Sequence, residues 1–421
     1  MRFFSFTPPA ALRHRDFRLL WLGLLVSVSG SMMQNAAILW LIYDLSNSAL
    51  ALGIVGLVRV LPIIAFSLIS GAIADKYDRR KLMLFSQTGM AVCAGLIGLL
   101  AYAGTASLWP IYLLAALSAS FGAFDLPARQ SLIPSLVPAE DLPNAFSLHA
   151  TVFQAASIIG PGLAGIVIAH FGIAWAFWLN TFSFVAVIVA LLRISYRPAP
   201  RPSETVPKIG RDAIVEGLQF VRRTPIILSS MLLDFFATFF SSATALLPIY
   251  AKDILHVGAF GYGWLYASAA IGALITGTWM SLMPTIGKQG KTLLISVFIY
   301  GLATVAFGFS RSFWIAFAAL ALTGAADTVS MIIRNTLRQL HTPDQLRGRM
   351  VSINMIFFMG GPQLGELEAG VLASWFGAPF SVVSGGIGCI IAVACVAWRW
   401  PLLWRYGSFS READKAQKIV V

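Results

Sequence analysis

Charged residues are scarce in this sequence: Asp, Glu, Lys and Arg make up 11% of the 421 residues, whereas 58% are hydrophobic. A water-soluble domain of this length needs a charged, solvated surface, which so few charges cannot supply. The apolar residues gather in long stretches, each able to cross the roughly 30 Å hydrocarbon layer of a bilayer as a helix. The sequence therefore predicts an all-α membrane protein whose medium is the lipid bilayer.

Motifs for cofactors and catalysis are also missing. The chain has no GxxxxGK[ST] loop, which excludes a primary pump driven by nucleotide hydrolysis, and no GxSxG or HExxH motif of an intramembrane hydrolase. Five scattered His residues show no metal-ligand spacing, and Cys93, Cys389 and Cys395 lie in apolar runs as small core residues. We therefore predict no enzymatic activity, no cofactor and no metal.

The apolar stretches and the positive charges together predict a topology. With the N-terminus in the cytoplasm, 27 of the 30 Lys and Arg residues fall on the inner side and only Lys252 and Arg311 on the outer side. The positive-inside rule then places both termini in the cytoplasm and explains the net charge of +12 without a nucleic-acid partner. Residues 1–18 lack a compact apolar core and a cleavage site, so we expect no signal peptide. The twelve predicted spans are 19–43, 49–74, 82–103, 108–130, 144–169, 175–195, 225–251, 261–284, 292–309, 312–335, 350–375 and 379–400.

A polar segment divides the spans into two sets of six. We predict an N-terminal six-helix bundle over 1–195, a cytoplasmic linker over 196–224 with a short surface helix from Asp212 to Arg223, and a C-terminal bundle with a cytoplasmic tail over 225–421. Residues 129–177 match 334–382 at ten positions without gaps, including an Arg, a Pro and a Phe-Gly pair. A repeat in the same direction predicts two pseudo-symmetric bundles around a central cavity, which suits alternating access.

The loop between the second and third spans reads GAIADKYDRRK, at residues 71–81. It resembles the signature loop of the major facilitator superfamily, although Lys76 and Asp78 depart from the usual residues. The resemblance implies a gating loop formed by Gly71, Asp75, Lys76, Arg79, Arg80 and Lys81. Asp75 would meet the N-terminus of the eleventh span near Gly348 and pair with Arg79. The alternative is that these basic residues only set the topology.

The fifth span contains SIIGPGLAG, at residues 157–165. It resembles the Gly-Pro motif of proton-coupled antiporters in the same superfamily, and the motif residues are Gly160, Pro161, Gly162 and Gly165. Proline removes a backbone donor and glycines permit close helix contact, so the motif favours a bend and tight packing. Ordinary small-residue packing is the alternative to an antiporter role.

Longer stretches extend the resemblance over nearly the whole chain. They include FRLLWLGLLVSVSG, PARQSLIPSLVPAEDLPNAFSL and GGPQLGELEAG. These are similar to the drug:proton antiporter branch that contains enterobactin exporters and macrolide efflux proteins. The resemblance implies a bacterial inner-membrane protein that is powered by the proton gradient.

Ionisable residues inside the membrane are costly and are therefore candidates for function. Asp234 in the seventh span is a candidate proton carrier, with a hydrogen-bonded structural Asp as the alternative. Arg59, Glu366 and Glu368 lie at similar depth in the second and eleventh spans, which the family places side by side. We predict an Arg59–Glu366 pair between the halves that loosens when Glu366 takes up a proton. Glu366 and Glu368 point nearly opposite ways, so only one of them is the partner.

Other polar residues in the spans have weaker signals. Asp125 with Arg129 and Asp327 with Arg334 share one helical face near the inner ends of the fourth and tenth spans, which favours structural ion pairs. Candidates for lining the cavity are Gln34, Asn35, His149 and Asn180, each equally explained by an interhelical hydrogen bond.

Together these features predict a monomeric secondary transporter that exports a small organic molecule, a drug-like compound or a siderophore, by proton antiport. The alternatives are a proton-coupled uptake symporter and a non-transporting receptor or scaffold on the same fold. The sequence does not identify the substrate.

Overall fold

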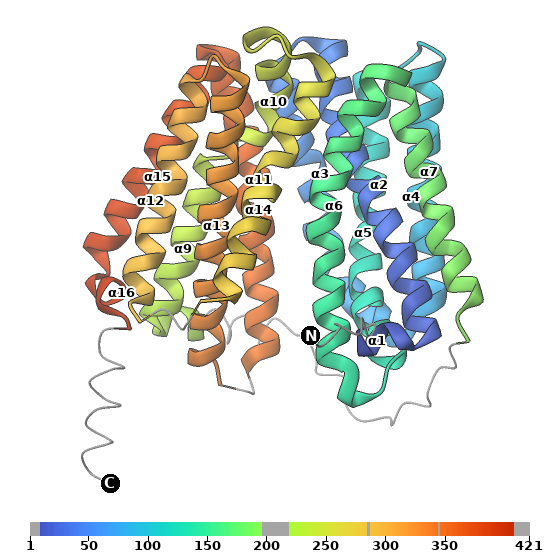
Figure 1. Ribbon diagram of the computed structural model, residues 1–421, viewed down its shortest axis with the longest axis horizontal. Helices are drawn as coiled ribbons and strands as arrows, with labels where there is room; N and C mark the ends of the chain where they lie inside the picture. The colour runs from blue at the N-terminus through green and yellow to red at the C-terminus, as the bar shows by residue number, and fades with distance from the viewer. Residues whose placement is uncertain (1–8, 196–218, 284–286, 344–345, 408–421) are drawn as a thin grey trace, which may run out of the picture. The chain divides into compact units, whose positions relative to one another are not determined.

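The computed structural model describes residues 9–195, 219–283, 287–343 and 346–407, apart from some side chains in α3 and α14. Helices dominate this part of the chain, and no strand occurs in it (Figure 1). The helices that precede the linker are α1 (Ala10–Arg13), α2 (Arg15–Ser46), α3 (Ala49–Lys76), α4 (Arg79–Tyr102), α5 (Leu108–Leu132), α6 (Leu142–Phe171) and α7 (Ile173–Arg193), with the 3-10 turns η1 (Ile133–Ser135) and η2 (Ala139–Asp141).

The helices that follow the linker form a second set. They are α9 (Pro225–Phe240), the 3-10 turn η3 (Ala243–Leu246), α10 (Leu247–Ile249), the π-helical turn η4 (Tyr250–Ile254), α11 (Gly258–Ser281), α12 (Gln289–Phe309), α13 (Phe313–His341), α14 (Arg347–Phe376), α15 (Ala378–Arg399) and α16 (Pro401–Arg405). Of the predicted surface helix, only 219–223 belongs to the described residues, and these five are helical.

The prediction of twelve spans is confirmed. Eleven segments of the described chain are long and apolar enough to cross a membrane. The twelfth is α14, whose 30 residues reach about 45 Å at 1.5 Å per residue. Large apolar side chains such as Phe85, Leu113, Phe182 and Ile275 are more than 60% exposed on the helices, as expected where hydrocarbon is the solvent. Cys395 is also exposed, so its predicted place in the core is wrong, whereas Cys93 and Cys389 are buried as expected.

The seventh span is not one continuous helix. Regular α-helix ends at Phe240, and the chain continues through η3, α10 and η4 to Ile254. Pro248 supplies no backbone donor, and the Ser242 hydroxyl donates to the carbonyls of Thr238 and Pro362, at 2.8 and 3.0 Å. The hydropathy of the sequence predicts a membrane span but does not show where its helical hydrogen bonding is interrupted. The break after Phe240 was therefore not predicted.

The contacts divide the chain into two compact units. Unit 1 comprises 1–46 and 61–204, and unit 2 comprises 47–60 and 205–421. The boundary therefore lies inside α3, next to Pro62, which interrupts the helical hydrogen bonding there. The first part of α3 belongs to unit 2 because Gly53 approaches α14 closely: a Cβ there would lie 3.0 Å from the Cα of Gly370.

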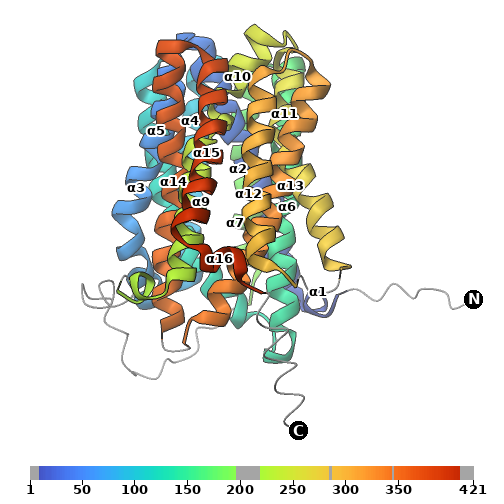
Figure 2. The same cartoon turned by 90° about the vertical axis from the view of Figure 1, so that its left-hand side faces the viewer.

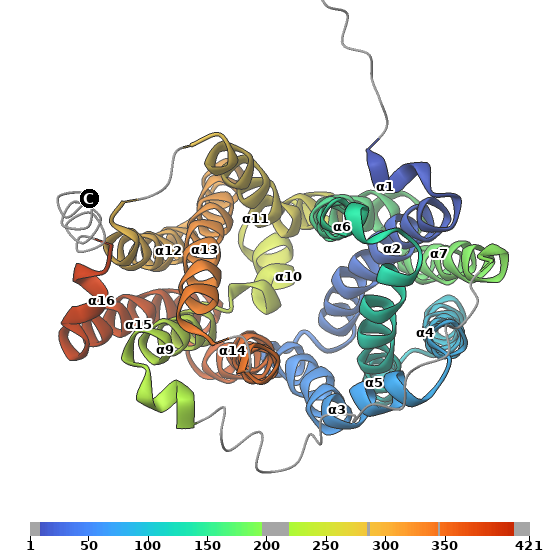
Figure 3. The same cartoon turned by 90° about the horizontal axis from the view of Figure 1, so that it is seen from below.

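The two units repeat the same internal packing. Three helices of unit 1 start 205 residues before their counterparts in unit 2: α5 before α13, α6 before α14 and α7 before α15. Gly172 and Gly377 follow α6 and α14 with φ of 89° and 87°, a conformation that glycine adopts without strain. In unit 1, α2 packs on α6 and α7. In unit 2, α9 packs on α14 and α15 and lies between them in Figure 3. The pairs α4–α5 and α12–α13 also correspond, which supports the predicted repeat.

Short elements cover the ends of each unit. In unit 1, the backbone N–H of Ala11 in α1 donates to Asn144 Oδ1 at 3.0 Å, which attaches α1 to the start of α6. In unit 2, α16 crosses the end of α12 (Figure 2), and a Cβ at Gly290 would lie 1.7 Å from the carbonyl oxygen of Leu403. Only glycine fits that contact without a shift of the backbone.

Two glycines of the α6 motif differ in what surrounds them, which makes a matched pair for mutation. A Cβ at Gly160 would lie 2.6 Å from the carbonyl oxygen of Ser29 on α2, whereas a Cβ at Gly162 would meet nothing within 4 Å. We expect Gly160→Ala to lower the free energy of unfolding by about 1–3 kcal/mol through overpacking. Gly162→Ala should be neutral or stabilise by up to about 1 kcal/mol, because Ala is the better helix former. Thermal midpoints of the detergent-solubilised variants test this, and equal shifts would contradict it.

Candidate functional site

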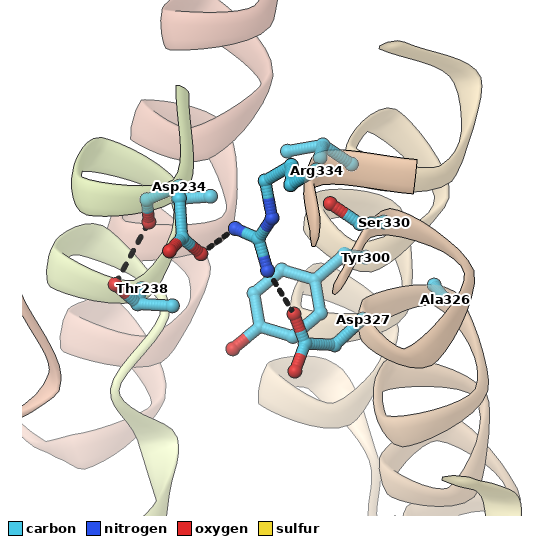
Figure 4. Close-up of a pocket in the computed structure, with 9 residues that line it drawn as sticks. Asp234, Thr238, Tyr300, Ala326, Asp327, Ser330 and Arg334 are labelled. Carbon is cyan, nitrogen blue, oxygen red and sulfur yellow. Dashed lines mark hydrogen bonds and ion pairs between the residues drawn. The ribbon is translucent and has the colours of Figure 1, made fainter. Parts of the chain in front are cut away.

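One arginine of unit 2 binds two carboxylates. Arg334 of α13 forms an ion pair with Asp234 of α9 through Nη1, and its Nη2 donates to Asp327 Oδ1 at 3.3 Å (Figure 4). Asp234 and Arg334 are 7% and 6% exposed, whereas 45% of the Asp327 side chain is accessible. The guanidinium thus lies between a buried carboxylate on one helix and a more open carboxylate on another. We call these three residues the carboxylate–arginine trio.

Helix geometry explains how the trio is assembled. Asp327 precedes Arg334 by seven residues, or two turns, so both side chains project from one face of α13. Asp234 lies in the regular part of α9, and Thr238, one turn later, donates its hydroxyl to the Asp234 carbonyl at 2.8 Å. Packing of α9 against α13 then brings Asp234 to the guanidinium.

A small cavity of about 10 Å³ adjoins the trio. Three helices of unit 2 line it, with Asp234, Ala237 and Thr238 from α9, Val297 and Tyr300 from α12, and Ala326, Asp327, Ser330 and Arg334 from α13. Most of the polar atoms in this lining are oxygens, and Figure 4 shows them grouped around the guanidinium. A volume of this size accommodates about one water molecule.

The charges of the trio do not cancel. Two ionised carboxylates and one guanidinium leave one negative charge in excess, and burying an uncompensated charge is expensive. Binding of one proton restores neutrality while Arg334 keeps a carboxylate partner. This arrangement can therefore take up and release a proton.

Unit 1 carries a corresponding arginine with a different environment. Arg129, 205 residues before Arg334, donates from Nε to Asp125 Oδ2 at 3.1 Å. Gln87 donates to Asp125 Oδ1 at 2.8 Å and accepts from Ser27 at 3.3 Å, so a buried chain of hydrogen bonds links α5, α4 and α2. Here one carboxylate faces one guanidinium, and the other members are neutral. The Asp125–Arg129 and Asp327–Arg334 contacts have the spacing that the sequence predicts for them.

A second charged cluster of unit 2 contains Arg59 and Glu366. The two side chains interact electrostatically, together with Tyr262 and Tyr266 of α11. Arg59 Nη2 and Glu366 Oε2 are buried and have no hydrogen-bond partner among the described residues. A Cβ at Gly56 would lie 2.8 Å from Glu366 Oε2, so the carboxylate packs against the backbone of α3. The sequence predicts this pair between two halves, whereas the contacts place both partners in unit 2.

Glu368, the other carboxylate of α14, is partly buried. Glu366 is the carboxylate that interacts with Arg59. That only one of the two faces the arginine stays a prediction.

The basic loop residues hold helix ends of unit 1 together. Arg79 donates to the carbonyl of Ser131 at 2.6 Å and Arg80 to that of Leu192 at 2.8 Å, near the C-terminal ends of α5 and α7. Such carbonyls lack partners within their own helix, and cations there are favourable. Asp78 caps α4 by accepting from the N–H groups of Arg80 and Lys81. The side chains of Gly71, Asp75 and Lys76 lie outside the described residues, as do those near Gly348.

Two of the predicted cavity residues bind each other. Asn180 Nδ2 donates to Gln34 Oε1 at 2.6 Å, and Ser183 donates to Asn180 Oδ1 at 2.8 Å, so the interhelical hydrogen bond accounts for both. Asn35 is partly buried, and His149 lies edge-on to Phe153, whose ring also faces the Arg129 guanidinium at 5.6 Å. Their role in lining a cavity stays a prediction. In the motif of α6, Gly160, Pro161, Gly162 and Gly165 are all buried.

Several members of these sites have no strong signal in the sequence. Gln87, Ser27, Thr238, Tyr300 and Ser330 are ordinary residues within apolar runs. The repeat that aligns Arg129 with Arg334 is the one pattern that points to the arginines as equivalent sites. Among the described residues, no group of three or more His, Cys, Asp or Glu side chains is arranged to hold a metal ion.

The profile of the transmembrane secretion effector family of the major facilitator superfamily matches residues 6–405, almost the whole chain. The chain belongs to this family. The resemblance inferred from its motifs is thereby confirmed, and the secretion effector is a transporter rather than an enzyme. It is a multi-pass protein of the bacterial inner membrane.

Two curated relatives are similar to this secretion effector over most of their length. It is 27% identical to the multidrug efflux pump Tap of Mycolicibacterium fortuitum, over 83% of the chain and 87% of Tap. It is 26% identical to the enterobactin exporter EntS of Shigella boydii, over 90% of each chain.

Solved structures share the fold of the secretion effector. A bacterial homologue of the human lysosomal transporter Spinster, in an inward-facing and unoccupied conformation, matches with a TM-score of 0.74 over 95% of this chain and 99% of that one. The sequence identity is 15%, so this likeness concerns the fold alone.

The trio makes a prediction about stability. Arg334→Gln leaves the buried Asp234 carboxylate without its partner, which we expect to lower the free energy of unfolding by about 3–5 kcal/mol. Asp234→Asn together with Arg334→Gln removes both charges, so the double variant should lose less than the sum of the single variants. Thermal midpoints in detergent measure the three differences, and additive losses would contradict the ion pair. Arg405→Gln, at an exposed position of α16, is the control.

Proposed function

We propose that this secretion effector exports a small organic molecule in exchange for a proton, and that the carboxylate–arginine trio carries the proton. The observation behind this proposal is that two carboxylates share the one buried guanidinium of Arg334. In the membrane such a site favours binding of one positive charge, and a proton is the smallest that is available. Asp234, which the sequence identifies as a candidate proton carrier, is part of this site.

Export is the direction supported by the relatives. Tap is named a multidrug efflux pump and EntS an enterobactin exporter, and the Gly-Pro motif of α6 is similar to that of antiporters. The substrate class that fits both relatives is a drug-like compound or a siderophore. A proton-coupled uptake symporter and a scaffold remain the alternatives that the transport assay below distinguishes.

The repeat supports transport by alternating access of a monomer. Each unit is compact, and α5, α6 and α7 of unit 1 correspond to α13, α14 and α15 of unit 2. The distribution of Lys and Arg supports a cytoplasmic location for both termini. A fluorescent protein fused after Val421, which matures in the cytoplasm but not outside, tests the orientation.

The Arg59–Glu366 pair is proposed as a second proton-sensitive element. It connects the first part of α3 to α14, and each partner has one buried polar atom that forms no hydrogen bond with the side chains and backbone that the structure describes. A pair in this condition is held by electrostatic attraction, which disappears when Glu366 is protonated. Release of this contact would free α3 from α14 during transport. The basic loop of Arg79, Arg80 and Lys81 is proposed to support the same movement from the inner ends of the helices.

Asp234→Asn tests the coupling. In proteoliposomes with an acidic interior, we expect the wild-type protein to accumulate ethidium or enterobactin and to release protons. In the variant, accumulation driven by the pH gradient should fall below about one tenth, because the trio no longer has a carboxylate to exchange on α9. Counterflow of the same compound without a gradient should remain, since it requires no net proton movement.

The control for this assay is Asp44→Asn, at the exposed end of α2, which should behave as wild type. Protons that move in the same direction as the compound would identify a symporter. An Asp234→Asn variant that accumulates the compound at the wild-type rate would contradict the proposed coupling site. A protein that moves neither compound in any mode would contradict the proposed substrate class.

Glu366→Gln tests the second element. Loss of the charge removes the attraction to Arg59, and we expect gradient-driven transport to slow about tenfold, equivalent to roughly 1.4 kcal/mol. Glu368→Gln is the matched control two residues away on α14, and it should transport at nearly the wild-type rate. Full proton coupling in Glu366→Gln would remove this residue from the mechanism.

A further inference from the structure

Ser330 differs from the other hydroxyl-bearing residues of its helix. Thr323 and Thr328 of α13 donate their hydroxyls to carbonyls of the preceding turn, at 2.6 and 2.8 Å. Ser330 is 1% exposed, yet its Oγ has no hydrogen-bond partner among the protein atoms that the structure describes. A buried hydroxyl without a partner destabilises a fold, which makes Ser330 an unusual residue of α13.

Ser330 lies beside the carboxylate–arginine trio. It follows Asp327 by three residues and precedes Arg334 by four, so it lies on the same face of α13 as the trio. Its side chain lines the cavity of about 10 Å³, beside Asp234, Asp327 and Tyr300 (Figure 4). A cavity of this size with two to four polar partners meets the requirements for one ordered water. The Ser330 hydroxyl and the two carboxylates provide those partners.

The two carboxylates differ in how accessible their side chains are. The Asp327 side chain is 45% accessible and bound to Arg334 by one hydrogen bond of 3.3 Å. Asp234 is buried and forms an ion pair with Nη1 of the same guanidinium. Asp327 is therefore the more accessible of the two carboxylates, and a proton that it receives needs a carrier to reach Asp234.

We propose that the cavity beside Ser330 binds one water molecule, which passes a proton between Asp327 and Asp234, with Ser330 as the residue that positions the water. This inference rests on the proposed proton antiport and specifies the path of the proton. It assigns to Asp327 a role in proton exchange, whereas its helical spacing from Arg334 alone suggests a structural ion pair.

The transfer conserves atoms and charge. The protonated Asp327 carboxyl gives its proton to the oxygen of the water, and the water gives one of its own protons to the Asp234 carboxylate. The water is unchanged, and the proton has moved from α13 to α9. Arg334 then exchanges partners, because Asp234 has become neutral and Asp327 has become the carboxylate. The trio holds one negative carboxylate, one guanidinium and one proton before and after, so no net charge is buried at either stage.

Other titratable groups surround the trio. Tyr300 of α12 faces the cavity, and Cys389 of α15 interacts with Tyr300. Arg338, one turn after Arg334 on α13, is a second cation near the guanidinium and donates to Asn335.

Ser330→Ala in the full chain tests the relay, with Thr328→Val as the matched control that removes a hydroxyl from the same helix. In proteoliposomes with an acidic interior, we expect Ser330→Ala to accumulate ethidium or enterobactin about tenfold more slowly than wild type. Counterflow of the same compound should be unchanged, because it requires no proton transfer within the trio. Thr328→Val should match wild type in both assays.

The outcomes separate this inference from the proposed function. If Asp234→Asn abolishes gradient-driven transport while Ser330→Ala leaves it intact, the relay is overturned and the coupling site stands. If Ser330→Ala loses counterflow as well, Ser330→Thr decides, since it restores the hydroxyl. Recovery of both activities supports the relay, and recovery of counterflow alone overturns it. Replacing all Na⁺ by choline should have no effect, and dependence on Na⁺ would overturn the water in favour of a bound cation.

Discussion

The interaction on which the site depends is the sharing of one buried guanidinium by two carboxylates. Hydrocarbon offers no water to solvate an ion, so each charge inside a span must find its partner within the protein. Arg334 fulfils this for Asp234 and Asp327 at once, which ties α9 to α13 at a defined depth. A small cavity adjoins this ion-paired cluster, and Tyr300 and Ser330 line it.

Much of the fold could be predicted from hydropathy and repeats. The first residue of every predicted span lies within four residues of the first residue of an observed helix. This agreement arises because a helix must be long and apolar enough to cross the hydrocarbon layer, and that requirement is visible in the sequence. The repeat between 129–177 and 334–382 reappears as helix starts 205 residues apart and as matching glycine conformations after α6 and α14. The break after Phe240 was not predictable in this way, because it depends on hydroxyl contacts of Ser242 that leave the apolar pattern unchanged.

The candidate site was predictable only where its members lie on one helix. The period of 3.6 residues places Asp327 and Arg334 on the same face of α13, and likewise Asp125 and Arg129 on α5. Asp234 lies one hundred residues before Arg334, and a single sequence does not show which of several buried cations a carboxylate will meet. The Arg59–Glu366 pair could be predicted as a hypothesis, because the number of residues between each side chain and the outer end of its span places both at a similar depth. The unbonded hydroxyl of Ser330 becomes visible only when the neighbours of each atom are known.

The neutral network around Arg129 has an electrical consequence for the whole transporter. Among the described residues, Arg129 pairs with one carboxylate, Asp125, whereas Arg334 pairs with two. If the trio exchanges one proton in each transport cycle, a cycle that exports a neutral compound transfers one elementary charge across the bilayer. The membrane voltage then adds about 2.3 kcal/mol per 100 mV to the driving force. A monocationic cargo would cancel that charge, and its export would respond to acidity alone.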